Sequence, residues 1–224
     1  MNIRLVISIV IAIVLMIITE VKDYIVITTK IARKRGRPAA FDRNEAVDAA
    51  LELFWKKGYD SVGVAELGEA IGINPPSLYK AFGSKHGLFE EAVQRYTAED
   101  RGGFLPKALV GAVTLKDVVS NILVQAAKSY TNRKKPPGCL VLSGTSNSTD
   151  SHAMATTDAH RQATKVYLAR IFSDYGTHDA NSLAEYVLIA MAGLSSAARQ
   201  GTNRNTLVNT AKNFASADIV SQNV

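Results

Sequence analysis

From position 42 onward, apolar residues recur at three- and four-residue intervals along most of the chain, which is the spacing of one face of an α-helix. Glycine, proline and polar residues separate these segments. The pattern predicts an all-α protein. Its expected helices cover about 42–57, 64–71, 75–82, 85–96, 115–130, 151–174, 180–199 and 204–217.

Two of the expected helices, 64–71 and 75–82, are short and meet at a tight turn. Gly72 ends the first helix, and Asn74 can cap the second. Pro75 is tolerated directly after a cap because the first-turn N–H groups have no intrahelical partner. The stretch over about 64–83 therefore predicts a helix-turn-helix unit, in which the second helix lies in the DNA major groove and the first crosses the backbone.

Composition agrees with a helical protein that binds an anion. The chain has 224 residues, enough for one large domain or two small ones, and a formal net charge of +6, which favours a partner such as nucleic acid. Cys139 is the only cysteine, so no intramolecular disulfide can form and a reducing cytoplasm is expected. Basic residues gather before the first expected helix, at Lys30, Arg33, Lys34, Arg35, Arg37 and Arg43.

A series of residues around the helix-turn-helix is characteristic of one protein family. The series comprises Ala50-Leu51-Glu52-Leu53-Phe54 followed by Gly58-Tyr59, then Leu67 with Gly72-Ile73, and Leu78-Tyr79 with Phe82, Ser84-Lys85 and Leu88-Phe89. Over about 41–96, the chain resembles the DNA-binding region of the TetR/AcrR family of bacterial transcriptional regulators. Two residues depart from the family pattern: Gly63 stands where a Ser or Thr cap is usual, and Pro75 where a basic residue is common.

The resemblance implies a domain plan and a function. It implies a basic arm over 31–41, a three-helix DNA-binding domain over 42–88, and a larger helical ligand-binding and dimerisation domain over 89–224. In the family, the last two helices of two subunits form a four-helix bundle. The implied partners are therefore a second copy of the chain, a double-stranded DNA operator and a small-molecule ligand that releases the repressor from a palindromic site. No cofactor is implied.

The arm holds the first candidate DNA contacts, Arg35 and Arg37. Gly36 and Pro38 flank Arg37 and disfavour a helix there. An extended arm with arginines fits a minor groove, because narrow A·T-rich grooves carry an enhanced negative potential. A solvated basic tail is the alternative interpretation.

The second helix of the helix-turn-helix holds the other candidates. Tyr79 resembles the family tyrosine that hydrogen-bonds a phosphate, and Lys80 can approach a phosphate or a guanine edge. Lys85 begins the next helix after Ser84 as a cap, where its charge opposes the helix dipole, so a bound phosphate would relieve the conflict. Trp55 is interpreted as a packing residue. The full predicted set outside the arm is Gly63, Pro76, Ser77, Tyr79, Lys80 and Lys85.

Residues 1–30 form an apolar extension with a run from Leu5 to Ile18 broken only by Ser8. The run is short for a membrane span of about 20 residues and fits a signal-peptide core of roughly 7 to 15, although no A-x-A-like cleavage site follows. Three interpretations stand: a membrane anchor, an export signal, or upstream DNA translated from a misassigned start codon. Family members often begin just before such an arm, which favours the third, with Ile31 in place of the initiator Met.

The second domain offers candidate ligand contacts at Tyr130, Cys139, His152 and Tyr167. Cys139 is interpreted as a small core residue, with an oxidation-sensitive thiol as the alternative, because thiolate reactivity needs an exposed electropositive site. His152 and His160 can share a helix face, but no HExxH or CxxC spacing supports a metal site. No acid, base and nucleophile arrangement stands out, so an enzyme is disfavoured. A membrane-tethered regulator is the alternative to a cytoplasmic one.

Overall fold

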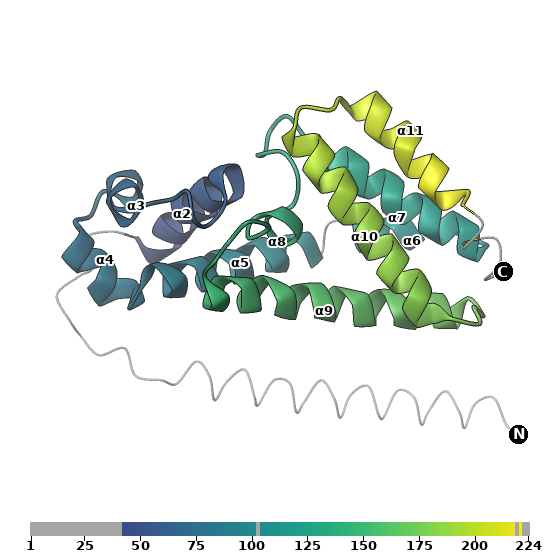
Figure 1. The fold of residues 1–224 in the computed structure, drawn as a ribbon, viewed down its shortest axis with the longest axis horizontal. Coiled ribbons are helices and arrows are strands. Elements are labelled where there is room, and N and C mark those ends of the chain that lie inside the picture. Colours follow the sequence, from purple (N-terminus) through teal and green to yellow (C-terminus); the bar gives the residue numbers. More distant parts are fainter. Residues whose placement is uncertain (1–41, 102–103, 218–219, 221–224) are drawn as a thin grey trace, which may run out of the picture. The chain divides into compact units, whose positions relative to one another are not determined.

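The computed structural model describes residues 42–101, 104–217 and 220. Helices account for most of this part of the chain, and it contains no strand, which confirms the all-α prediction (Figure 1). The apolar run Leu5–Ile18 and the arm with Arg35 and Arg37 lie outside the described residues. The helices are α2 (Arg43–Lys57), α3 (Val64–Ile71), α4 (Pro75–Phe82), α5 (Lys85–Arg101), α6 (Leu105–Leu109), α7 (Leu115–Tyr130), α8 (Leu140–Ser143), α9 (Ser151–Asp174), α10 (Ala180–Arg199) and α11 (Arg204–Ala215).

Capping residues set the boundaries of the first helices. The Asp42 side chain accepts a hydrogen bond from the Asn44 N–H at 2.7 Å and begins α2. α3 ends at Gly72, whose φ of 78° lies in the left-handed region that a glycine adopts without strain. The Asn74 side chain accepts from the Ser77 N–H at 2.9 Å, and Pro75 is the first residue of α4. These contacts confirm the predicted helix-turn-helix.

A small aromatic core holds the helix-turn-helix together. Phe54 of α2 is fully buried, with its ring 5.1 Å from Phe89 of α5 and 5.8 Å from Tyr59, measured between ring centroids. Leu67 of α3 and Leu78 of α4 are also fully buried against this cluster. Burying one such side chain stabilises the fold by about 1.5–3 kcal/mol, so each helix is anchored by at least one large residue.

The remaining helices pack as a second layer of helix pairs. α7 contacts both α11 and α10, and its buried face runs from Leu115 to Tyr130 as the sequence predicts. α9 contacts α5 near one end and α10 near the other (Figure 1). α10 occupies the range that the sequence predicts, and α11 ends two residues earlier, at Ala215.

The local predictions were incomplete. α6 was not predicted, and α8 is a single turn of four residues. In α9, the apolar residues Ala155 and Val166 are both exposed, Val166 by 60%. The buried residues of α9, Ala153, Thr157, Leu168, Ile171 and Phe172, lie on one face at helical spacing, and Ala155 and Val166 lie on the opposite face.

Within the stretches 42–101 and 104–217, no helix is both long and apolar enough to cross a membrane.

Candidate functional site

The exposed face of α4 is the candidate DNA-reading surface. Ser77, Tyr79 and Lys80 point to solvent, with Tyr79 49% exposed, while Leu78 and Phe82 are buried. Pro76 is exposed beside them. Gly63 is the N-cap of α3, makes no side-chain cap bond, and has no atom within 4 Å of the place a Cβ would take. The backbone there is open to close approach by another molecule.

Lys85 differs from Lys80 because it packs inward. Its ammonium nitrogen lies 4.1 Å from the centroid of the Tyr59 ring, and the side chain is half-buried. Burial lowers the pKa of the Lys85 ammonium, while the carboxylates of Asp60 and Asp150 act in the opposite direction. The dipole conflict expected from the sequence is therefore met inside the protein by an aromatic face and two acids, and the phosphate contact stays a prediction.

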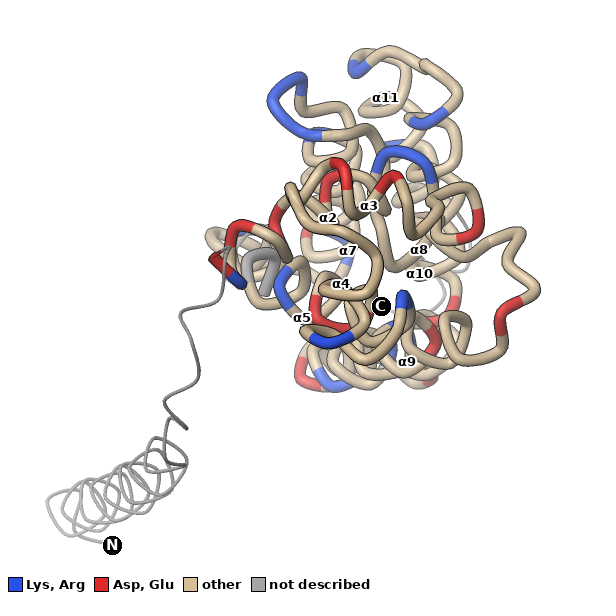
Figure 2. Tube along the Cα trace, turned by 90° about the vertical axis from the view of Figure 1, so that its left-hand side faces the viewer, with Lys and Arg blue, Asp and Glu red and all other residues tan. Residues whose placement is uncertain are grey.

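Charge is unevenly divided between the arm and the helices beside it. Residues 42–88 carry five Lys and Arg against seven Asp and Glu, a net charge of −2, whereas 31–41 carry four basic residues and no acid. Figure 2 looks onto the end of the molecule that carries α4, where basic and acidic segments lie intermixed. Several of the basic residues are also engaged, as in the ion pairs Arg43–Glu91 and Lys57–Glu66.

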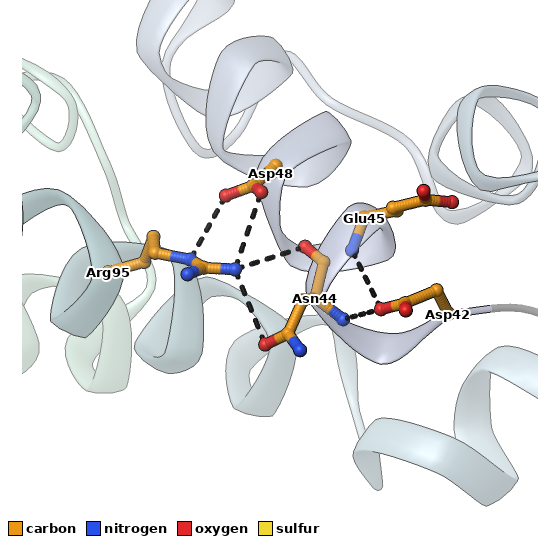
Figure 3. A network of polar contacts seen from close by, with 5 residues as sticks. All are labelled: Asp42, Asn44, Glu45, Asp48 and Arg95. Atoms are coloured by element: carbon orange, nitrogen blue, oxygen red, sulfur yellow. Dashed lines mark hydrogen bonds and ion pairs between the residues drawn. The ribbon is translucent and has the colours of Figure 1, made fainter.

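A polar network fixes the start of α2, which is where the chain emerges from the arm. Arg95 of α5 donates from Nε to Asp48 at 3.0 Å, and its Nη2 lies 3.4 Å from both the side-chain and backbone oxygens of Asn44 (Figure 3). Asn44 in turn donates its N–H to the Asp42 cap. The first turn of α2 is thereby tied to α5, the helix that continues toward the larger helical layer.

The turn after α2 is joined to the segment around α8. Trp55 donates from Nε1 to the Gly138 carbonyl at 3.1 Å and packs edge-on against Tyr96, which confirms its packing role. The Tyr59 N–H donates to the Gly144 carbonyl at 2.9 Å, and its hydroxyl donates to Asp150 at 3.1 Å. The Arg199 guanidinium at the end of α10 donates to the Trp55 carbonyl. Segment 138–144 thus directly contacts the candidate DNA-reading unit, which comprises α2, α3 and α4 with the turns between them.

The other side of segment 138–144 borders a cavity of about 500 Å³, a volume typical of small-molecule sites. Cys139, Val141 and Leu142 line it from this segment. Of the predicted ligand contacts, Tyr130, Cys139 and Tyr167 line the cavity together. The other residues that line it are Tyr96, Thr97, Phe104, Leu105, His160, Ala163, Thr164, Leu188 and Met191.

His152 does not reach the cavity. It lies exposed on the first turns of α9, with its ring 5.5 Å from that of His86, whose Nε2 is 3.0 Å from the Thr156 hydroxyl. The histidine at the cavity is His160, two helical turns further along. From the sequence, His160 was interpreted only as a possible metal ligand. Across the described residues, no three His, Cys, Asp or Glu side chains come together as a metal site.

Cys139 is held in place from two directions. Its N–H donates to the Ser195 hydroxyl at 2.7 Å, and its sulfur accepts from the Tyr96 hydroxyl at 3.2 Å. The residue is 7% exposed, so a packing role and a place in the cavity wall coexist.

Sequence comparisons place these features in a known family. Residues 46–92 match the model for bacterial regulatory proteins, tetR family. The chain is 33% identical over 198 residues to the HTH-type transcriptional repressor BdcR of Escherichia coli (strain K12), covering 83% of this chain and 93% of the relative. It is 30% identical over 190 residues to the repressor ComR of the same strain, covering 81% and 90%.

The fold agrees with the sequence. A cysteine mutant of the TetR family transcriptional regulator CifR, solved with 26 bp double-strand operator DNA, has a TM-score of 0.72 and 30% identity and covers 81% of this chain and 99% of that chain. The reduced form of Escherichia coli NemR, at 15% identity and a TM-score of 0.64, shares the fold alone. On its capped helix-turn-helix, its helical second layer and these relatives, the chain belongs to the TetR family of bacterial transcriptional regulators.

Proposed function

We propose that the protein is a homodimeric repressor that inserts α4 into the major groove of a palindromic operator. The observation that carries this proposal is the exposed face of α4, with Ser77, Tyr79 and Lys80 outward on a helix fixed by Asn74 and by the buried Leu78. Named repressors among the relatives and the operator complex of CifR support it. Because residues 42–88 are net acidic, the arm with Arg35 and Arg37 supplies much of the attraction to DNA.

The dimer would be built from α10 and α11. On α10, Ile189 is 63% exposed, and Gly193 and Ser196 are exposed four and seven residues later, on the same helix face. Small residues beside one large apolar residue allow another helix to approach closely. Ile189→Asp should therefore give monomers in gel filtration, whereas the matched change Val166→Asp on α9, also exposed, should leave the dimer intact.

The cavity would take the small molecule that releases the repressor. Segment 138–144 lines the cavity through Cys139 and hydrogen-bonds the DNA-reading unit through Trp55 and Tyr59. A ligand that fits one position of this segment better would shift the population toward dimers with a changed spacing of the two α4 helices. We also propose a cytoplasmic location, where the operator lies. Recovery of residues 1–30 in a membrane fraction would instead favour a membrane-tethered regulator.

DNase footprinting with gel filtration tests the core of the proposal. The dimer should protect two half-sites about one helical turn, roughly 34–36 Å, apart. Lys80→Ala should weaken protection, while Lys107→Ala, an exposed lysine on α6, should not. A monomer at micromolar concentration that still protects a single half-site would contradict the dimer. A change that replaces Arg35 and Arg37 by Ala tests the arm in the same assay.

A further inference from the structure

The cavity is lined by aromatic and aliphatic surface rather than by charge. Tyr96, Phe104, Tyr130 and Tyr167 bring four aromatic rings to it, and Leu188 and Met191 of α10 add aliphatic surface. Among its lining residues, all of them within the described part of the chain, none is Asp, Glu, Lys or Arg. A bound ion would therefore lose its hydration without gaining a carboxylate, ammonium or guanidinium partner in the wall, which is unfavourable.

Three hydroxyl groups of the wall already donate their hydrogens to other groups of the protein. Thr97 donates its hydroxyl to the Val93 carbonyl at 3.0 Å, and Thr164 donates to the His160 carbonyl at 2.9 Å. Tyr96 donates to the sulfur of Cys139 at 3.2 Å. Each oxygen keeps lone pairs that can accept, while its hydrogen is used inside the protein. The Thr97 and Thr164 hydroxyl oxygens therefore offer acceptors to a guest that carries a donor.

We propose that the regulatory ligand of this cavity is an uncharged, largely aromatic molecule that carries a hydrogen-bond donor. This inference rests on the proposed function, since it names the class of molecule that would release the repressor. The aromatic rings would attract a cation over their faces. A cation still lacks a carboxylate in this wall, so the neutral form binds best.

Two fluorescent probes with one ring skeleton test the charge preference. N-phenyl-1-naphthylamine is neutral with one N–H donor, and 8-anilinonaphthalene-1-sulfonate carries the same rings with a sulfonate. Titrated into the full-length dimer, the neutral probe should bind saturably and at least about tenfold more tightly than the sulfonate, a difference of 1.4 kcal/mol or more. Displacement of the neutral probe by 1-naphthalenemethanol should likewise exceed that by 1-naphthoate and by 1-naphthylmethylammonium.

Two substitutions on α9 locate the binding and test its cause. Ala163 is exposed at the cavity rim, so Ala163→Trp should fold normally by thermal unfolding and reduce binding of the neutral probe at least about tenfold by occupying the cavity. Thr164→Lys places an ammonium at the wall and should improve binding of the sulfonate while leaving the cationic competitor weak.

Each outcome decides the inference. Sulfonate binding equal to or tighter than neutral binding would overturn it, as would the absence of saturable neutral binding. Neutral binding that Ala163→Trp leaves unchanged would place the probe elsewhere and would also overturn it. Neutral binding that leaves operator affinity unchanged would support the ligand class and contradict release by ligand, so the two proposals fail separately.

Discussion

Gly138 sits where segment 138–144 is clamped between α10 and the DNA-reading unit, and its replacement by alanine tests that junction. Its φ is 78°, in the left-handed region. A Cβ added there would lie 2.8 Å from the Ser195 carbonyl oxygen and 2.9 Å from Cγ of Arg199. Gly176, after α9, has a φ of 80° but no atom within 4 Å of its added Cβ. The pair therefore shares backbone strain and differs in steric collision.

The expected loss of unfolding free energy follows from the backbone strain and the steric collision. Left-handed geometry costs an L-residue about 1–2 kcal/mol, and the reduced freedom of the unfolded chain returns about 0.4–1 kcal/mol, in both variants. Overpacking against a backbone oxygen adds about 1–3 kcal/mol at Gly138 alone. We expect Gly176→Ala to lower the free energy of unfolding by about 1 kcal/mol and Gly138→Ala by about 2–4 kcal/mol.

Urea unfolding followed by far-UV circular dichroism, with all proteins at one concentration, measures the difference. Trp55 is the only tryptophan and donates to the Gly138 carbonyl, so its emission should also shift in native Gly138→Ala and stay unchanged in Gly176→Ala. Equal losses of stability in the two variants would refute the reasoning, because the collision would then contribute nothing.

Three further predictions concern single side chains. Lys85→Ala should weaken all DNA sequences alike and reduce the salt slope by about one unit, whereas Lys80→Ala should also relax preference at one base pair, and equal loss of specificity in titrations of operator variants would contradict this division. Tyr79→Phe should leave thermal stability unchanged, since the side chain is half-exposed, and weaken operator binding about tenfold in a gel-shift titration through the loss of one charge-assisted hydrogen bond of ~1.5 kcal/mol; unchanged affinity would reduce Tyr79 to packing. Hydrogen bonds from the Ala153 backbone and the Tyr59 hydroxyl, among others, hold the pKa of Asp150 below its ordinary value. The Asp150 carboxylate therefore stabilises the fold above the unfolded pKa of about 3.9, and this stability is lost as the pH falls through the folded pKa. Because Asn also caps helices, thermal unfolding of Asp150→Asn between about pH 5 and pH 3 should depend less on pH, and an unchanged dependence would assign the acid sensitivity elsewhere.

The local features of the fold could be predicted because their causes lie within a few residues. Asn74 caps α4 through the N–H of Ser77, three positions away, and Gly72 ends α3 through its own φ. The inward and outward faces of α4 follow from helical spacing, so Leu78 is buried and Tyr79 exposed as expected. The series from Ala50 to Phe89 indicates the family from the sequence alone, because it combines these local signals at fixed distances.

Tertiary structure alone decided which side chains meet across the chain. Lys85 lies on the ring of Tyr59, 26 positions earlier, and Trp55 reaches Gly138, 83 positions later. His160 rather than His152 lines the cavity because the cavity borders α9 only from His160 to Tyr167, two helical turns beyond His152, whose ring lies beside His86. Helical periodicity reports which face of a helix is apolar, but not which neighbour covers it. That choice depends on how the whole set of helices packs together.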